Sequence, residues 1–325
     1  MPRKPPTGSE FDTVIIGAGP AGMSAALYAA RLGLKSIIIG EEIGGALTEA
    51  GEVDDYPGLI GVQGPDLAKK FEQHIRKYRV PIVRDKVVRV EKGSSFKVTL
   101  MGGETYVSKT VIVAVGSRRR KLGVPGENEF SGKGVTYCAP CDAPLFKGKV
   151  TAVVGGGNAA LQAALLMTVY SPKVYLIHRR DEFRAFPVYI KKVRSDPRIE
   201  LVLNAEVRRI GGSKSVEWVD VLRKDIGEEF RLSVEGVIIE IGSEPPKDFL
   251  KSMGLRLDEK GYVVVGPGQE TNIDGVFAAG DCTAGPHKKK FDQVVTAVAE
   301  GAVAALSAYE YVTLGKGLPA EELQY

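Results

Sequence analysis

The chain has 325 residues, of which 44% are apolar and 26% are charged, and it contains only three cysteines. This length suits about two domains of roughly 150 residues each. Domains of that size bury a core without disulfide bonds, so a disulfide-rich mini-protein is excluded. The formal net charge of +4 is too weak to indicate nucleic-acid binding, although it is compatible with an anionic small-molecule ligand.

Two stretches without charged residues, 13–30 and 150–172, are long enough to suggest membrane helices. Each contains a glycine cluster near its start, which a strand–turn–helix needs and a membrane helix does not. The first ten residues hold three prolines and no apolar run, which argues against a signal peptide. We therefore expect no membrane association and a cytoplasmic location, where thiols stay reduced unless they are catalytic.

One strand–turn–helix–strand unit occurs twice in the sequence. In the first copy a strand at 11–16 leads into the turn GAGPAG at 17–22, a helix at 23–32 and a strand at 36–39. In the later copy a strand at 150–154 leads into GGGNAA at 155–160, a helix to about residue 170 and a strand at 174–177. This pattern is the βαβ unit of a parallel sheet.

Short alternating strands follow each βαβ unit, at 86–92, 96–101 and 104–107 and again at 207–210, 216–223 and 229–234. Two apolar strands, 110–115 and 236–241, end at Gly116 and Gly242. The proline-bearing segments after them, 117–125 and 243–246, are the expected domain crossings. Strands at 262–265 and 275–279 and a helix at 294–312 complete the chain.

This layout predicts an α/β fold with two Rossmann-like, three-layer dinucleotide-binding domains, the second inserted into the first. Residues 1–120 and 246–325 are expected to form the first domain, and residues 121–245 the second.

Both glycine turns have the context that dinucleotide binding requires, because each follows an apolar strand and precedes a helix. The first glycine makes the tight turn, the second lets a pyrophosphate approach the backbone, and the third permits close packing of helix and strand. The phosphates then meet free N–H groups at the positive end of the helix dipole.

The residues after the second strand of each unit distinguish the two ligands. In the first copy Glu41 and Glu42 stand where a carboxylate accepts a hydrogen bond from a ribose 2′-hydroxyl, which fits FAD or NAD. In the second copy the same place holds His178, Arg179 and Arg180, with Arg184 one helical turn on. Guanidinium groups bind a 2′-phosphate bidentately, which indicates NADPH; the alternative is a solvated basic helix start.

The sequence Cys138-Ala139-Pro140-Cys141-Asp142 lies between the two nucleotide turns. The residues do not favour a zinc site, because one further cysteine and three scattered histidines do not make a ligand set, so no metal is expected. A structural disulfide across so short a loop would remove little entropy from the unfolded state. The pattern therefore favours a redox dithiol, in which one sulfur attacks a disulfide and the other resolves the mixed disulfide.

Asp142, next to the dithiol, has two competing interpretations. Asp142 is placed to exchange a proton with a thiol, or alternatively it is a turn residue or a helix cap. Cys282 has no cysteine near it in sequence and is expected to be a packed residue.

Five motifs together, GAGPAG (17–22), CAPCD (138–142), GGGNAA (155–160), HRRDEFRA (178–185) and GVFAAGDC (275–282), resemble low-molecular-weight thioredoxin reductases. The resemblance covers nearly the whole chain, and CAPCD is its most specific element. It implies a homodimer with an FAD domain made from both chain ends and an inserted NADPH domain that carries the dithiol. It also implies electron flow from NADPH through FAD and Cys138/Cys141 to a thioredoxin or glutaredoxin-like protein disulfide, with rotation of one domain relative to the other.

The resemblance adds Gly280-Asp281 at the ribityl and pyrophosphate part of FAD, the segment from Gly44 to Leu47 beside the flavin, and Gln293 at the flavin edge. The residues expected at FAD are Gly17, Gly19, Pro20, Ala21, Gly22, Glu41, Glu42, Gly44, Gly45, Ala46, Leu47, Asp55, Gly116, Gly280, Asp281, Gln293 and Val294. The residues expected at NADPH are Gly155, Gly157, Asn158, Ala159, Ala160, His178, Arg179, Arg180, Arg184, Ile241 and Gly242.

The chain departs from the family pattern at several of these places, namely at Ala46, Asp55, Val115, Asn158, Ala159, Gln162 and Asp292. The intact arginines preserve the expectation of NADPH. The rival hypotheses are a ferredoxin:NADP⁺ reductase, an O₂-dependent dithiol oxidase and a non-enzymatic redox-sensing flavoprotein. The retained dithiol argues against the first of these and the arginine set against the last, while the order in which the two cysteines act stays open.

Overall fold

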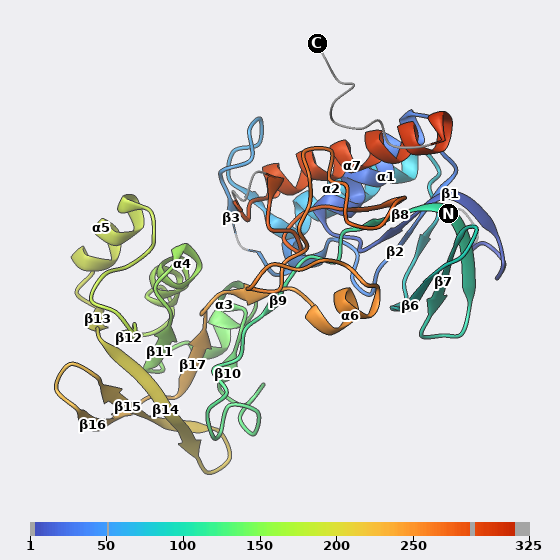
Figure 1. Ribbon diagram of the computed structural model, residues 1–325. Coiled ribbons are helices and arrows are strands. Elements are labelled where there is room, and N and C mark those ends of the chain that lie inside the picture. The colour runs from blue at the N-terminus through green and yellow to red at the C-terminus, as the bar shows by residue number, and fades with distance from the viewer. Residues whose placement is uncertain (1–3, 51, 287–289, 316–325) are drawn as a thin grey trace. The chain divides into compact units, whose positions relative to one another are not determined.

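The computed structural model describes residues 4–50, 52–286 and 290–315. The chain forms two compact units, one made of Met1–Arg118 and Glu244–Tyr325 and the other of Arg119–Ser243 (Figure 1). The second unit is thus a single insertion into the first. Each unit has a parallel sheet with helices, which confirms the predicted α/β class with two Rossmann-like domains.

The first unit is built on a seven-stranded sheet in the order β5-β2-β1-β8-β7-β6, with β19 also paired to β8. Its elements before the insertion are β1 (Glu10–Ile16), α1 (Pro20–Arg31), β2 (Ser36–Ile39), η1 (Gly45–Glu49), β3 (Glu52–Val53), β4 (Val62–Gln63), α2 (Gly64–Lys77), β5 (Ile82–Val83), β6 (Val87–Lys92), β7 (Phe96–Leu100) and β8 (Thr105–Val113). After the insertion come α6 (Lys247–Ser252), β19 (Val276–Ala278) and α7 (Val294–Leu314). The short strands β9 (Arg118–Arg119) and β18 (Ser243–Glu244) pair with each other at the two crossings.

The two faces of this sheet are covered differently, which gives three layers. Ile15, Ile38 and Ile112 point to the face covered by α1, α2 and α7, which lie side by side in Figure 1. Their neighbours Val14, Ile37 and Val111 point to the opposite face, where β7 and the segment after α6 cover them. The side chains of 13–16 in β1, of all of β2 and of 110–113 in β8 are buried on one face or the other, as expected for a doubly covered parallel sheet.

The second unit repeats this design around a five-stranded parallel sheet in the order β10-β17-β11-β12-β13, with a separate antiparallel sheet β14-β15-β16. Val153, Leu176 and Ile238 face α3, α4 and α5, whereas Ala152 and Ile239 face β14 and β15. Its elements are β10 (Val135–Thr136), α3 (Ala139–Asp142), η2 (Ala143–Phe146), β11 (Thr151–Val154), α4 (Asn158–Met167), β12 (Val174–Ile177), α5 (Pro187–Ser195), β13 (Ile199–Val202), β14 (Ala205–Gly212), β15 (Val216–Arg223), β16 (Glu228–Ser233) and β17 (Gly236–Ile239).

Some predicted elements differ in the structure. The expected strands 104–107 and 110–115 are one strand, β8, because its first part pairs with β7 and its second part with β19 along the same edge. The expected strand 262–265 is wrong, since Val263 makes only isolated bridges, to Leu257 and Thr283. The helix predicted at 23–32 starts earlier, at Pro20, and the one predicted to reach residue 170 ends at Met167.

The two uncharged stretches that could suggest membrane helices are the strand–turn–helix segments β1–α1 and β11–α4. Over the three ranges that the structure describes, no helix has both the length and the apolar character needed to cross a membrane.

The packing of α7 on α1 depends on Gly301, because a Cβ at this position would lie 2.1 Å from the carbonyl oxygen of Ala21. We predict that Gly301→Ala lowers the free energy of unfolding by about 1–3 kcal/mol through this clash. At an exposed helical site the same change would stabilise the protein by roughly 0.5–1 kcal/mol. Thermal and denaturant unfolding measure the effect, with Ala302→Gly as a control on the adjacent position, and a more stable Gly301→Ala protein would contradict the close approach.

Candidate active site

The first glycine turn is shaped by two close backbone approaches and leaves one position open. Gly17 has a φ of +111°, and a Cβ on it would lie 2.1 Å from the carbonyl oxygen of Ala114. A Cβ on Gly22 would lie 1.9 Å from the carbonyl oxygen of Gly17. Around Gly19, by contrast, the nearest atom is 3.9 Å away, which leaves room for a ligand against the backbone.

The start of α1 is suited to phosphate groups. Gly19 is its N-cap and Pro20 its first residue, and no side chain caps the free N–H groups of the first turn. Unsatisfied donors at the positive end of a helix dipole attract an anion. The turn and the helix start therefore fit a pyrophosphate.

The segment from Gly44 to Leu47 lies against this turn. The amide of Gly44 donates to the carbonyl of Ala18 at 2.8 Å, and a Cβ on Gly45 would lie 3.0 Å from the Cα of Gly19. Leu47 is buried in a small apolar cluster that Val294 also contacts. The fold thus brings three of the sequence-predicted segments together: the first glycine turn, the 44–47 segment and the start of α7.

The acidic pair after β2 has two different environments. Glu41 is exposed and lies 3.6 Å from both Lys86 Nζ and the Arg118 guanidinium. The Glu42 carboxylate accepts a 2.6 Å hydrogen bond from the Thr48 hydroxyl, which joins it to the end of η1. Both carboxylates stand at the carboxyl end of β2, where a ribose is expected to bind.

A second turn, after β19, carries Gly280 and Asp281. The amide of Gly280 donates to the Glu300 carboxylate at 2.7 Å, and its Cα approaches α1 so closely that a Cβ would lie 2.9 Å from that of Ala21. Burial raises the pKa of Asp281 to about 6. In the described part of the chain the Asp281 carboxyl is half-buried and accepts no hydrogen bond, so it is available to bind a hydroxyl group of a ribityl chain.

These observations fit FAD. The open backbone at Gly19, the uncapped α1 and the free Asp281 acceptor match a pyrophosphate and a polyhydroxyl chain.

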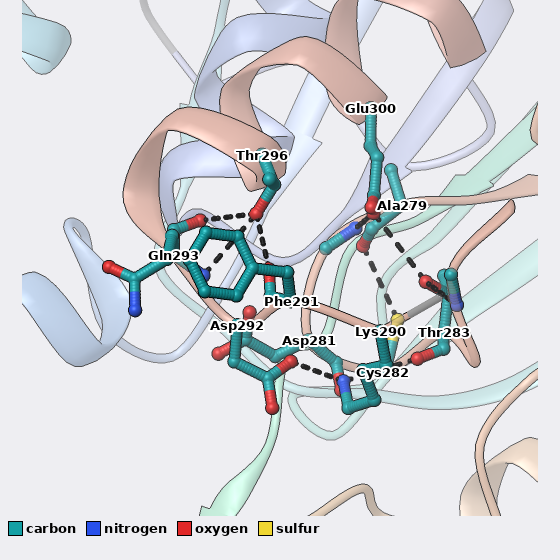
Figure 2. Close-up of polar contacts among 12 residues, drawn as sticks. Ala279, Asp281, Cys282, Thr283, Lys290, Phe291, Asp292, Gln293, Thr296 and Glu300 are labelled. Atoms are coloured by element: carbon teal, nitrogen blue, oxygen red, sulfur yellow. Dashed lines mark hydrogen bonds and ion pairs between the residues drawn. The ribbon is translucent and has the colours of Figure 1, made fainter. Parts of the chain in front are cut away.

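Gln293 is the N-cap of α7, and its side chain extends away from Asp281 and Lys290 (Figure 2). Gly116 follows β8 with a φ of +61°. Asp55 is exposed.

The second glycine turn has the same construction as the first. A Cβ on Gly155 would lie 2.1 Å from the carbonyl oxygen of Glu240, and one on Gly156 would lie 2.1 Å from the His178 ring. No atom lies within 4 Å of a Cβ placed on Gly157, which is also the uncapped N-cap of α4. Gly157 therefore takes the ligand-facing place that Gly19 takes in the first turn.

The basic segment after β12 is tied to this turn. The Arg184 amide donates to the Gly156 carbonyl at 2.8 Å, and the Phe186 amide donates to the Asn158 side chain at 2.7 Å. Asn158, a departure from the family pattern, thus holds the arginine segment. Arg179 and Arg184 are exposed, and neither makes an ion pair with a described carboxylate, so both guanidinium groups are available to a 2′-phosphate.

His178 packs against the basic segment through its buried ring. Its ring is buried, stacks on Phe183 with centroids 5.4 Å apart, and has Nε2 3.1 Å from the carbonyl of Glu182. Burial lowers the pKa of His178, so the ring is held in its neutral form. Four other expected NADPH residues have different environments. Ala160 is buried beneath Gly155, and Ala159 is exposed. Ile241 packs on the core of the second unit, and the Gly242 carbonyl accepts a hydrogen bond from the Arg120 amide.

Cys138 and Cys141 form a disulfide at the short helix α3. Cys138 is the N-cap and nearly buried, whereas Cys141 is exposed. The Asp142 carboxylate accepts a 2.5 Å hydrogen bond from the Thr136 hydroxyl and makes no side-chain cap, so the helix-cap interpretation is wrong. In the described chain, no group of His, Cys, Asp and Glu side chains is arranged to hold a metal ion.

The chain that enters the dithiol is anchored by Glu127, which sequence reasoning missed. Its carboxylate is 1% exposed and accepts from the amides of Leu122 and Gly123 at 2.9 and 2.7 Å and from the Tyr137 hydroxyl at 2.7 Å. Burial, together with this hydrogen bond, raises the pKa of Tyr137. Since Tyr137 directly precedes Cys138, Glu127 fixes one end of the dithiol segment.

Two further residues were also missed. Glu300 binds the Gly280 amide, and Lys290 binds the carbonyls of the same turn. Glu300 could have been singled out from the sequence, because Glu300 and Glu310 are the only charged residues of α7. Cys282 is free and fully buried, which confirms that it is a packed residue.

The profile of the family described as pyridine nucleotide-disulphide oxidoreductase matches residues 11–301. The chain belongs to this family. It is 38% identical over 314 residues to a thioredoxin reductase of Listeria innocua, covering 96% of this chain and 97% of the relative. It is 35% identical over 303 residues to an NADH dehydrogenase of Bacillus subtilis, covering 93% of this chain but only 58% of that longer protein. The crystal structure of Lactococcus lactis thioredoxin reductase matches with a TM-score of 0.89 at 33% identity and covers 94% of this chain and 99% of its own.

For this family member we predict that Asp281→Asn stabilises the protein freed of FAD. In the folded protein the pKa of the Asp281 carboxyl is raised from 3.8 to about 6. Between these two pH values the folded state therefore binds more protons than the unfolded state. Stability is therefore lost as the pH rises through this window, by about 3 kcal/mol. Asp281→Asn should remove the loss and raise the unfolding temperature at pH 7.5, while it weakens FAD binding. Unfolding from pH 4 to pH 8 measures this, and equal pH profiles for the two proteins would contradict it.

Proposed function

We propose that the protein is an NADPH-dependent flavoenzyme that reduces the disulfide of a thioredoxin or of a glutaredoxin-like protein. The observation that carries the proposal is the Cys138–Cys141 disulfide, with an exposed Cys141, in the same unit as a dinucleotide turn and a free arginine segment. A purely structural disulfide of this span would stabilise little, and a protein that does not turn over NADPH has no need of the arginines.

The first unit is the proposed FAD domain, and the second is the proposed NADPH domain. When bound, FAD would accept two electrons from NADPH and pass them to the Cys138–Cys141 disulfide, which would become the dithiol. The first turn, the 44–47 segment and Asp281 would hold FAD, with Gln293 at the flavin edge. The turn at Gly157 and the guanidinium groups of Arg179, Arg180 and Arg184 would hold NADPH.

The reduced dithiol would then act by thiol–disulfide exchange. One thiolate attacks the disulfide of the partner protein, which breaks that bond and forms a mixed disulfide. The second cysteine displaces the partner's remaining sulfur, so that the partner leaves as a dithiol and Cys138–Cys141 is oxidised again. Asp142, held by Thr136, is positioned to supply or receive the proton that each thiolate exchange requires.

The resemblance also implies a cytoplasmic homodimer. The exposed valines and leucine on α7, Val295, Val303 and Leu306, offer an apolar face that a second copy would cover. Sedimentation at micromolar concentration would test the dimer, and a monomer there would contradict it.

We predict that anaerobic NADPH bleaches the flavin absorbance of the holoenzyme and that oxidised thioredoxin restores it. Cys138→Ser should still be bleached by NADPH but should not reduce thioredoxin, because exchange needs both sulfurs. Cys282→Ala is the control and should keep full turnover, since this buried thiol lies outside the exchange. A protein that NADPH reduces but that no thioredoxin-like disulfide reoxidises would refute the proposed substrate. Full thioredoxin reduction by Cys138→Ser would refute the role of the dithiol.

We further predict that Arg179→Ala with Arg180→Ala weakens NADPH about 100-fold or more and NADH far less. Each lost charge-assisted contact to the 2′-phosphate costs about 1.5–3 kcal/mol, and NADH has no such group. Stopped-flow reduction of the flavin at varied NADPH and NADH concentrations gives both affinities. Arg194→Ala, an exposed arginine on α5, is the control. Equal losses for the two nucleotides would show that these arginines do not bind the 2′-phosphate.

A further inference from the structure

Three carboxylates and one ammonium converge on the turn after β19 (Figure 2). Asp281 belongs to the turn itself, Lys290 and Asp292 precede α7, and Glu300 comes from α7. Burial raises the pKa of both Asp281 and Glu300, so a full negative charge on either is unfavourable without a cation nearby.

Lys290 supplies that cation, and all its donors are used. Its Nζ lies 2.9 Å from the carbonyl oxygen of Asp281 and 3.2 Å from that of Thr283, and it forms an ion pair with Asp292. The ammonium also lies 4.2 Å from the centroid of the Tyr262 ring. An ammonium with three donors and an aromatic face is fully engaged in this geometry.

These contacts join two segments that are close in sequence, since Lys290 follows Asp281 by nine residues. One is the turn that presents Asp281, and the other is the start of α7, where Gln293 is the N-cap. Glu300 joins the same turn to the second turn of α7 by accepting from the Gly280 amide. The turn is thus held from α7 at Glu300 and from the preceding segment at Lys290.

We propose that Lys290 is a positioning residue for the flavin, which holds the Asp281 turn against the start of α7 and offsets the negative charge of Asp292 beside it. The inference rests on the proposed function, because it takes the Asp281 turn and Gln293 as the flavin-side contacts of FAD. A positive charge near a flavin favours its reduced form, since reduction adds negative charge to the ring system. Lys290 therefore tightens FAD and makes the midpoint potential of the flavin less negative.

Because Lys290 and Asp292 carry opposite charges, removing each should shift the midpoint potential of the flavin in opposite directions. Lys290→Met removes the cation and should weaken FAD about tenfold and shift the midpoint potential to more negative values. Asp292→Asn removes the opposing charge and should shift the potential to more positive values. Lys290→Arg keeps the charge and should restore most of both properties. Lys109→Met, which breaks an exposed ion pair with Asp12 on the same sheet, is the matched control.

The experiment uses the holoenzyme and needs neither NADPH nor thioredoxin. Flavin released on dilution gives the dissociation constant, and dithionite titration against dyes of known potential gives the midpoint potential. Opposite shifts for Lys290→Met and Asp292→Asn, with rescue by Lys290→Arg, support the proposal. Wild-type values for Lys290→Met, or shifts of the same sign in both variants, overturn it. A wild-type protein that holds no FAD overturns the proposed function itself, and the inference with it.

Discussion

At the centre of each unit, a backbone carbonyl oxygen occupies the space that a side chain on the first glycine would need. The carbonyl of Ala114, just after β8, stands against Gly17, and the carbonyl of Glu240, just after β17, stands against Gly155, both 2.1 Å from an added Cβ. Any other residue would push the strand-to-helix turn away from the neighbouring strand. The helix that follows would then no longer start at the carboxyl edge of the sheet, where its free N–H groups meet phosphates.

Other contacts build on this constraint and are specific to each unit. In the first unit the turn is completed from both chain ends, by the 44–47 segment and by Gly280 against Ala21. In the second unit it is completed locally, by the buried His178 ring over Gly156 and by the Asn158 side chain. The same scaffold therefore presents one site rich in acceptors, at Glu41 and Asp281, and one rich in guanidinium groups. Under the proposed function, FAD in one unit and NADPH in the other would be selected by these different side chains on similar backbone turns.

The βαβ units were predictable from the sequence because their apolar runs are unbroken and their glycines stand at fixed offsets. The polar residues Ser108 and Lys109 made β8 look like two strands in the sequence. The two parts form one strand because they pair with β7 and β19 along the same edge, and such long-range pairing leaves no local sequence pattern. The 262–265 run looked like a strand because its side chains are apolar, yet it lacks a partner of strand length. Asn158 was expected at NADPH and noted as a departure from the family pattern, but its hydrogen bond to Phe186 was not predictable, because the two residues are 28 apart in sequence.

The complete burial of Cys282 has a practical consequence. Its pKa is raised to about 12 by that burial, so at neutral pH it is neither ionised nor reachable by reagents in water. After reduction, the thiols that react in the native protein are those of Cys138 and Cys141. Alkylation followed by mass spectrometry then reports the redox state: the dithiol gains label, first at the exposed Cys141, and the disulfide gains none. Cys282 serves as an internal monitor that gains a label only when the fold opens.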